Sequence, residues 1–199
     1  MALDIDYYVS LNSPWTYLGG AQLADLAQRY GARVQVKPVD FGKIFPLSGG
    51  LPLAKRAPQR QAYRLVELKR WSDFRGIPLT LHPKFFPTSE TLKAGMVVAA
   101  GEMAGAPLAL CQAILTAVWA EDRDTADPAT LIEIATATGH DGPALLARAQ
   151  APQMQASLDS LTQEAIDAGV FGAPSYVIEG EIFWGQDRLD FVTRRVARG

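Results

Sequence analysis

The sequence predicts an α/β fold in which a small sheet is interrupted by a large helical insertion. Strand-like patterns lie near the two ends of the 199-residue chain, at residues 3–9, 33–39 and 175–184. The roughly 125 residues between the second and third patterns are mostly helical in periodicity. We expect two domains: a discontinuous sheet domain of residues 1–40 and 170–199, and a helical insertion domain of residues 41–169.

The first strand and the first helix are predicted to meet at Ser13. Residues 3–9 read as a strand and residues 14–30 as a helix with an apolar face. Pro14 suits the first helical position, because the N–H that it lacks has no partner there in any helix. Ser13 is then the N-cap, where free backbone N–H groups and the positive end of the helix dipole favour an anion. Gly31 follows as the expected C-cap.

The next elements follow from the same reasoning. Residues 33–39 alternate like a strand, so the first two strands and the helix between them form a βαβ unit with parallel strands. Residues 40–57 are rich in glycine and proline and are expected to be a loop. The helices expected after it span about residues 58–75, 89–103, 107–121, 128–138, 143–148 and 154–168.

The end of the chain predicts a hairpin and a last helix. Residues 175–179 and 181–184 are strand-like and flank a glycine turn at Gly180. A helix is expected over residues 188–197, with Asp187 as its N-cap.

Composition excludes several classes of protein. The formal charge is −2 without a basic stripe, which argues against a nucleic-acid partner. No stretch approaches the roughly 18 apolar residues of a membrane span, and the N-terminus lacks the pattern of a signal peptide. With Cys111 as the single cysteine, a reducing, cytoplasmic compartment is expected. His82 and His140 lie far apart without a cysteine cluster, so no metal site is expected.

The junction at Ser13 matters because thioredoxin-type oxidoreductases place a Cys-x-x-Cys pair at such a position. Here the four residues are Ser13-Pro14-Trp15-Thr16, so the chain supplies no thiol. Any sulfur chemistry would need a sulfur that arrives with a ligand. Cys111 has no second cysteine to resolve a mixed disulfide, which disfavours a dithiol oxidoreductase.

Four stretches, in this order and spacing, carry a resemblance over about residues 4–195. They are residues 13–18 (SPWTYL), 63–78 (YRLVELKRWSDFRGIP), 171–174 (FGAP) and 184–189 (WGQDRL). With them the chain resembles the 2-hydroxychromene-2-carboxylate isomerase family, glutathione-dependent proteins of the DsbA-like thioredoxin superfamily close to the kappa-class glutathione transferases. The resemblance implies a thioredoxin-like fold with a helical insertion, a serine in the active-site slot, bound glutathione and a homodimer.

The resemblance assigns cofactor-binding roles to five residues. Ser13 would hydrogen-bond the sulfur of glutathione and hold it as a thiolate, since a free thiol with a pKa of about 8.5 is mostly protonated at neutral pH. The Ala173–Pro174 bond would be cis, which leaves the Ala173 backbone free to pair with a peptide-like ligand. Asp187 would receive the γ-glutamyl ammonium, and Gln186 with nearby N–H groups its carboxylate. An N-cap serine, a loop proline and a capping aspartate are the structural alternatives.

The substrate side rests on looser similarity. A carboxylate substrate needs a cation, and aromatic walls would hold its ring. The candidates are Trp15, Lys43, Arg56, Arg60 and Phe85. For the basic residues the alternative is a solvated surface, and for Phe85 it is core packing.

These residues lead to one hypothesis and two alternatives. The hypothesis is a glutathione-dependent isomerase that interconverts an aromatic 2-hydroxychromene carboxylate and its benzylidenepyruvate by reversible thiolate addition. The first alternative is a kappa-type transferase that conjugates glutathione to electrophiles. The second is a module that binds glutathione or a peptide without turnover.

Overall fold

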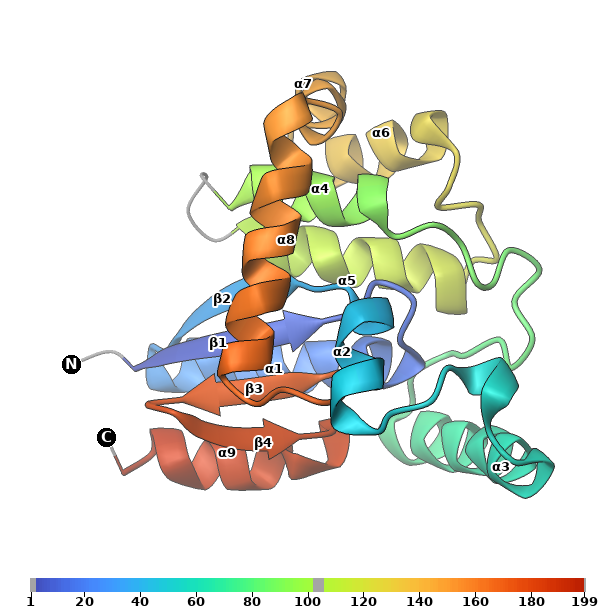
Figure 1. Cartoon of the computed structure of the whole chain (residues 1–199), viewed down its shortest axis with the longest axis vertical. Helices are drawn as coiled ribbons and strands as arrows, with labels where there is room; N and C mark the ends of the chain where they lie inside the picture. Colours follow the sequence, from blue (N-terminus) through green and yellow to red (C-terminus); the bar gives the residue numbers. More distant parts are fainter. Residues whose placement is uncertain (1–2, 102–105, 199) are drawn as a thin grey trace.

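The protein is a four-stranded mixed sheet surrounded by helices (Figure 1). The computed structural model describes residues 3–101 and 106–198. The strands are β1 (Asp4–Val9), β2 (Arg33–Pro38), β3 (Ser175–Ile178) and β4 (Glu181–Trp184). Their order is β2-β1-β3-β4, with β1 parallel to β2 and antiparallel to β3, and β3 antiparallel to β4. The predicted βαβ unit and hairpin are therefore confirmed.

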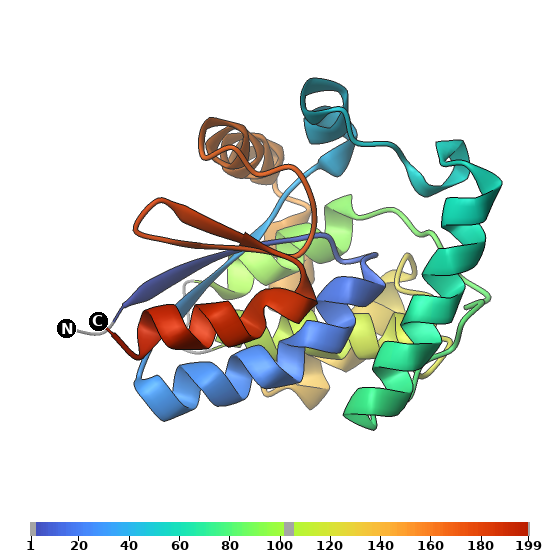
Figure 2. The same cartoon turned by 90° about the horizontal axis from the view of Figure 1, so that it is seen from below.

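Helices cover both faces of the sheet. Helix α1 (Pro14–Tyr30) and helix α9 (Leu189–Val196) lie on one face, and α8 (Pro152–Asp167) lies across the other (Figures 1 and 2). Beyond β2 lie α4, α5, α6 and α7, of which α4 and α5 contact that strand. Their bounds are Thr91–Ala100 for α4, Ala106–Trp119 for α5, Pro128–Ala137 for α6 and Gly142–Ala149 for α7. Helix α3 (Pro58–Arg75) stands at the end of the sheet where β1 terminates (Figure 2).

Strand alternation divides the core between the two faces. Tyr7 and Tyr176 are buried in the larger cluster with α1 and α9, and their rings stack with centroids 5.2 Å apart. Tyr8 and Val177, the next residues on the same strands, belong to a smaller cluster with α8. Successive side chains of a strand point to opposite faces, so both faces of β1 and β3 are buried. The larger cluster is continuous from the sheet into α3–α7.

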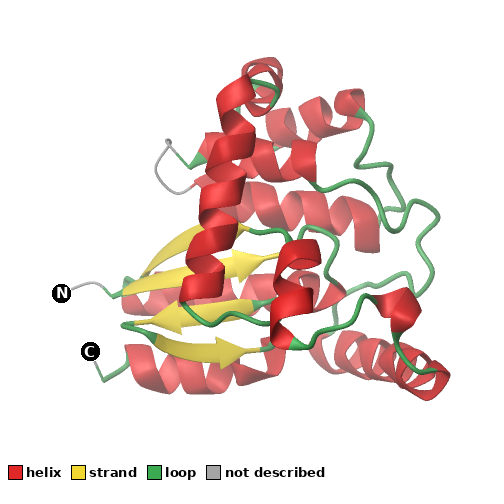
Figure 3. Ribbon diagram, viewed as in Figure 1, coloured by secondary structure: helices red, strands yellow, loops and turns green. Residues whose placement is uncertain are grey.

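Two expectations from the sequence are corrected by the structure. Residues 40–57 are not simply a loop: α2 (Phe41–Ser48) begins there with Asp40 as its N-cap, and a 3₁₀ turn covers Leu53–Lys55 (Figure 3). The apolar side of α2 packs against α8, which overrides the glycine and proline content. Asp187 does not cap α9, because it lies inside a 3₁₀ turn, Gln186–Arg188, that precedes the helix.

The expected ends of the other helices agree with the structure to within a few residues, although the C-terminal end expected for the 89–103 helix lies partly outside the described residues. Within the described part of the chain, no helix has the length and apolar character needed to cross a membrane.

Candidate active site at the end of the sheet

Three distant chain segments meet where β1 ends. The register pairs Tyr8 of β1 with Ser175 of β3, and Ser175 with Trp184 of β4. The segment after β1, the segment before β3 and the segment after β4 therefore lie at the same end of the sheet, where these strands begin or terminate. The amide of Gly185, the residue after β4, donates to the carbonyl of Pro174 at 2.9 Å. The sheet thus brings together the regions of the predicted site residues.

Ser13 is the N-cap of α1, as the sequence predicts. Its Oγ accepts a hydrogen bond from the Thr16 amide at 3.2 Å, and its carbonyl accepts one from the Tyr17 amide at 3.1 Å. No described group accepts the hydroxyl proton of Ser13, and none accepts the Trp15 amide. Two donors thus remain free at the positive end of a 17-residue helix, a combination that stabilises an anion.

A buried polar network holds the turn that leads to Ser13. The carboxylate of Glu90 accepts from the Ser10 hydroxyl and from the Leu11 amide, both at 2.7 Å. The Lys93 ammonium donates to Asn12 Oδ1 at 2.7 Å. Lys93 is fully buried, and burial lowers its pKa to about 8 although the charges of Glu90 and Asp124 oppose this shift. Lys93 of helix α4 and Glu90, the residue before that helix, therefore fix this turn.

The segment that leads into β3 contains Ala173–Pro174, whose peptide bond is cis, as expected. Neither the N–H nor the C=O of Ala173 has a hydrogen-bond partner among the described residues. The Ser175 hydroxyl donates to the Gly172 carbonyl at 2.7 Å and fixes the loop. A Cβ at Gly172 would lie 2.4 Å from the Trp184 indole nitrogen, so only glycine lets this ring cover the loop.

The turn after β4 places Gln186 and Asp187 at this end of the sheet. Gln186 is buried, and its side-chain oxygen Oε1 has no partner among the described residues. Arg75 of α3 donates to the carbonyls of Leu18 and Gln186, at 2.9 and 3.0 Å. The Arg75 guanidinium also lies 5.2 Å from the centroid of the Trp71 ring. Arg75 therefore ties α3 to both α1 and the Gln186 turn.

A pocket of about 550 Å³ lies between α3 and these segments. Its aromatic lining consists of Trp15, Tyr63, Trp71 and Trp184. Its charged lining consists of Arg56, Arg60, Arg64, Glu67, Asp187 and Arg188. Ala173 and Gln186 also line the pocket. An aromatic anion matches this combination of flat rings and excess positive charge.

The predicted site residues separate into two groups. Trp15, Arg56 and Arg60 line the pocket, together with Ala173, Gln186 and Asp187. Ser13 and Pro174 are not in the lining, but each is within two residues of a lining residue.

Lys43 and Phe85 do not reach the pocket. Lys43 is in α2, and its ammonium pairs with Asp159 of α8 at 2.8 Å. Phe85 lies 4.8 Å from the Lys84 ammonium, on the loop before α4. Neither residue is among those that line this pocket, and the loose local similarity at Lys43 did not reveal that α2 packs against α8.

Reasoning from the sequence missed the stripe of α3 that faces the pocket. Gln59, Tyr63, Glu67 and Trp71 recur every four residues, with Arg64 beside them. Trp71 both packs against the larger core cluster and lines the pocket. The four-residue spacing was the available signal, because residues at i and i+4 share a helix face.

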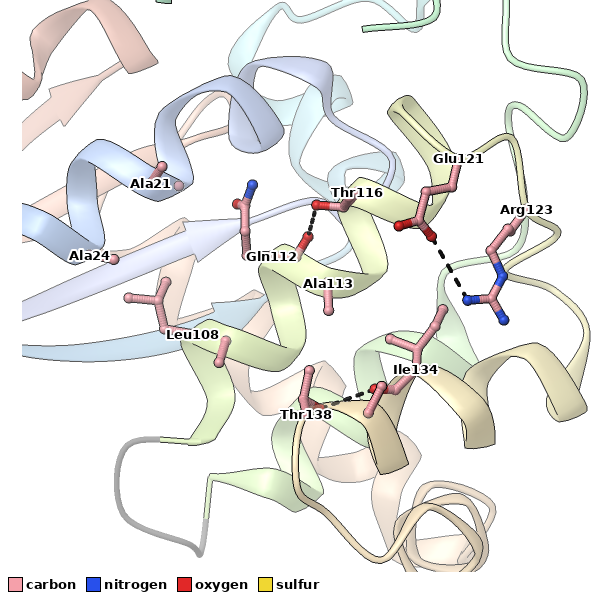
Figure 4. Close-up of a pocket in the computed structure, with 13 residues that line it drawn as sticks. Ala21, Ala24, Leu108, Gln112, Ala113, Thr116, Glu121, Arg123, Ile134 and Thr138 are labelled. Atoms are coloured by element: carbon pink, nitrogen blue, oxygen red, sulfur yellow. Dashed lines mark hydrogen bonds and ion pairs between the residues drawn. The ribbon is translucent and has the colours of Figure 1, made fainter. Parts of the chain in front are cut away.

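A second pocket of about 620 Å³ lies elsewhere, between α1, α5 and α6 (Figure 4). Figure 4 shows small and apolar side chains, such as Ala21, Ala24 and Leu108, along most of its wall. Its charged pair, Glu121 and Arg123, is internally matched, at 3.8 Å. None of the predicted site residues lines it.

The chain is similar to known proteins over nearly its whole length. Residues 4–197 match the model of the DSBA-like thioredoxin domain family. The chain is 30% identical over 193 residues to 2-hydroxychromene-2-carboxylate isomerase of Sphingobium xenophagum, covering 96% of this chain and 97% of the relative. It is 23% identical over 201 residues to glutathione S-transferase kappa 1 of Caenorhabditis elegans, covering 94% and 88% of the two chains.

A solved structure of a 2-hydroxychromene-2-carboxylate isomerase superposes on this chain with a TM-score of 0.81. The sequence identity is 25%, and the superposition covers 98% of this chain and 95% of the other. The thioredoxin-like fold with added helices, expected from the resemblance, is confirmed.

Proposed function

The chain belongs to the DSBA-like thioredoxin domain family and to the family of the 2-hydroxychromene-2-carboxylate isomerases, and from this we propose that it is an isomerase with glutathione as its cofactor. Its substrate would be an aromatic 2-hydroxychromene carboxylate, converted reversibly to its benzylidenepyruvate. The observation that carries the proposal is Ser13, a hydroxyl with a free proton at the N-terminus of α1, where relatives with redox activity of the thioredoxin type need a cysteine.

The residues around Ser13 fit a bound tripeptide thiol. Ala173 offers an unpaired backbone N–H and C=O, which suits an extended peptide backbone. Gln186 holds a buried side-chain oxygen without a partner, and such an atom is costly unless a ligand donates to it. Asp187 lines the pocket, and its carboxylate could bind an ammonium in place of the Arg188 guanidinium with which it now pairs. Glutathione has an amide backbone that can pair with Ala173 and an ammonium that can donate to the acceptor oxygens of Gln186 and Asp187.

When bound, glutathione would supply a thiolate nucleophile that makes a carbon–carbon double bond of the substrate rotatable and is returned unchanged. Ser13 would donate its hydroxyl proton as a hydrogen bond to that sulfur, with the Trp15 amide beside it. The network through Glu90 and Lys93 keeps the turn before Ser13 in one geometry, so this donor needs no reorganisation during the reaction.

The pocket walls would orient the substrate. Flat rings of Trp15 and Trp71 offer stacking surfaces for an aromatic substrate. Arginines along α3 offer guanidinium groups for its carboxylate.

The test is Ser13→Ala, with Ser157→Ala on the exposed surface of α8 as the matched control. Loss of one charge-assisted hydrogen bond should raise the thiol pKa of bound glutathione by roughly 1–2 units and slow isomerisation about 10- to 100-fold. Calorimetry measures glutathione binding, and ultraviolet absorbance of the thiolate measures its pKa as a function of pH. An unchanged thiol pKa in Ser13→Ala, or no glutathione binding by the wild-type protein, contradicts the proposal.

The kappa-class relative makes conjugation of glutathione a second candidate, because the same thiolate would begin either reaction. The two reactions differ in whether glutathione is consumed, which a thiol assay during turnover measures directly. Binding without either activity would instead identify a binding module. The homodimer and the cytoplasmic location implied by the resemblance and composition stay predictions, and sedimentation of the purified protein tests the first.

A further inference from the structure

Arg64 is the arginine of the pocket whose charge is least compensated. It lies on α3, half-buried, and its side chain lines the pocket. Its guanidinium carbon is 5.9 Å from the centroid of the Phe86 ring and 5.8 Å from that of Trp119. Within the described residues it forms no ion pair and no hydrogen bond. Two aromatic rings therefore hold its guanidinium plane while all its N–H donors remain unused.

The surrounding charges do not supply the missing partner. Arg56 and Arg64 are close enough for their charges to oppose each other, and burial together with this repulsion lowers the pKa of Arg64 to about 10. Two carboxylates line the pocket, but each is already engaged. Glu67 accepts from Arg70 at 2.6 Å, and Asp187 accepts from Arg188 at 2.9 Å.

The other three pocket arginines have less need of a ligand, and Arg188 is already paired with Asp187. Arg56 donates to the Leu51 carbonyl at 2.8 Å. Arg60 is exposed, so water satisfies its donors. Burying a charged group without a polar partner is unfavourable, and folded proteins rarely retain such a group unless something binds it. An arginine fork presents parallel N–H donors that match the two oxygens of a carboxylate.

We propose that Arg64 binds a carboxylate group of a ligand in this pocket. The inference rests on the proposed function for the identity of the ligand. The carboxylate belongs either to the aromatic substrate or to the glycyl end of glutathione. In both cases Arg64 is a binding residue that fixes how deeply the ligand enters between α3 and the end of the sheet.

The experiment compares Arg64→Gln and Arg64→Lys with Lys69→Gln. Lys69 is on the same helix but is exposed and pairs with Asp73, so its replacement removes the same charge outside the pocket. In one arm, calorimetry measures the affinity for benzylidenepyruvate and for its methyl ester. In the other arm, it measures the affinity for glutathione and for its glycyl ethyl ester. Thermal unfolding verifies that each variant is folded.

We expect Arg64→Gln to lower the affinity for the carboxylate ligand about 10- to 100-fold and the affinity for its ester by no more than about twofold. The affinities of Arg64→Lys should lie in between. The arm that shows this difference identifies the source of the carboxylate. Equal losses for acid and ester, or no loss in either arm, overturn the inference. Failure of wild-type protein to bind glutathione would count against the proposed function alone, because the benzylidenepyruvate arm still tests Arg64.

Discussion

Two cations of this protein, the buried Lys93 and the half-buried Arg64, differ in how their charges are satisfied. Lys93 donates to Asn12 Oδ1 at 2.7 Å and to Thr88 Oγ1 at 2.6 Å, and Thr125 Oγ1 is 3.4 Å away. The carboxylate of Glu90 adds an attractive charge. Arg64 has two aromatic rings and, among the described residues, no oxygen partner.

The difference separates a structural charge from a binding charge. A buried cation surrounded by its own oxygen atoms rigidifies the chain around it and has no donor left for a ligand. A buried cation without such partners weakens the unliganded fold slightly and has every donor available. Lys93 therefore fixes the turn before Ser13, whereas the donors of Arg64 are available to an anion that enters the pocket.

The largest effect is expected for Lys93→Met. It leaves the Glu90 carboxylate and the Asn12 oxygen buried without their cation, which should lower the free energy of unfolding by about 3 kcal/mol. Urea denaturation measures the change. Lys69→Met, which breaks an exposed ion pair with Asp73, is the control and should change stability by less than about 1 kcal/mol. Equal losses in the two variants would remove the contrast between buried and exposed lysines.

The pH dependence of stability sharpens the assignment of Lys93. Burial lowers its pKa from 10.5 to about 8, so the folded protein releases this proton before the unfolded chain does. The stabilising contribution is complete above pH 10.5 and is lost as the pH falls through about 8. Between pH 7 and pH 10, the wild-type protein should therefore gain about 2 kcal/mol of unfolding free energy relative to Lys93→Met. Denaturation at several pH values measures this difference, and parallel curves for the two proteins would contradict it.

A smaller effect is expected for Arg64→Met. Without a ligand, this variant loses only contacts with two rings and is relieved of an unpaired charge, so its unfolding free energy should change by less than about 1 kcal/mol. The same denaturation experiment applies. A loss as large as that of Lys93→Met would show that Arg64 has a structural partner and is not reserved for a ligand.

The smallest effect is expected for Lys43→Ala. Both side chains of its ion pair with Asp159 are exposed, so the free energy of unfolding should fall by no more than about 0.5 kcal/mol. The KM of the isomerase reaction should stay unchanged, because Lys43 lies outside the pocket lining. Steady-state kinetics of the variant, with Arg60→Ala measured in parallel, would detect a substrate role for Lys43 as a rise in KM.

Features that depend on neighbouring residues can be predicted from the sequence of this protein. Ser13, Pro14 and Gly31 specify the start and end of α1 through capping and proline geometry, and the structure has those ends. The glycine turn between β3 and β4 was likewise readable, because the residues that make a tight turn are adjacent in the chain. The roles of Ser13, Ala173, Pro174, Gln186 and Asp187 came from a resemblance and stay predictions.

Which side chains face the pocket depends on how the helices pack in three dimensions. Local pattern could not show that Lys43 turns toward α8 while Arg64 turns inward, because both are basic residues outside the sheet. That choice depends on where α3 packs. Arg75 fixes it by hydrogen bonds to the carbonyls of Leu18 and Gln186, which are 57 and 111 residues away in the sequence. Contacts between residues so far apart leave no periodic pattern in the sequence. The residues that line the pocket are therefore defined only in the folded chain.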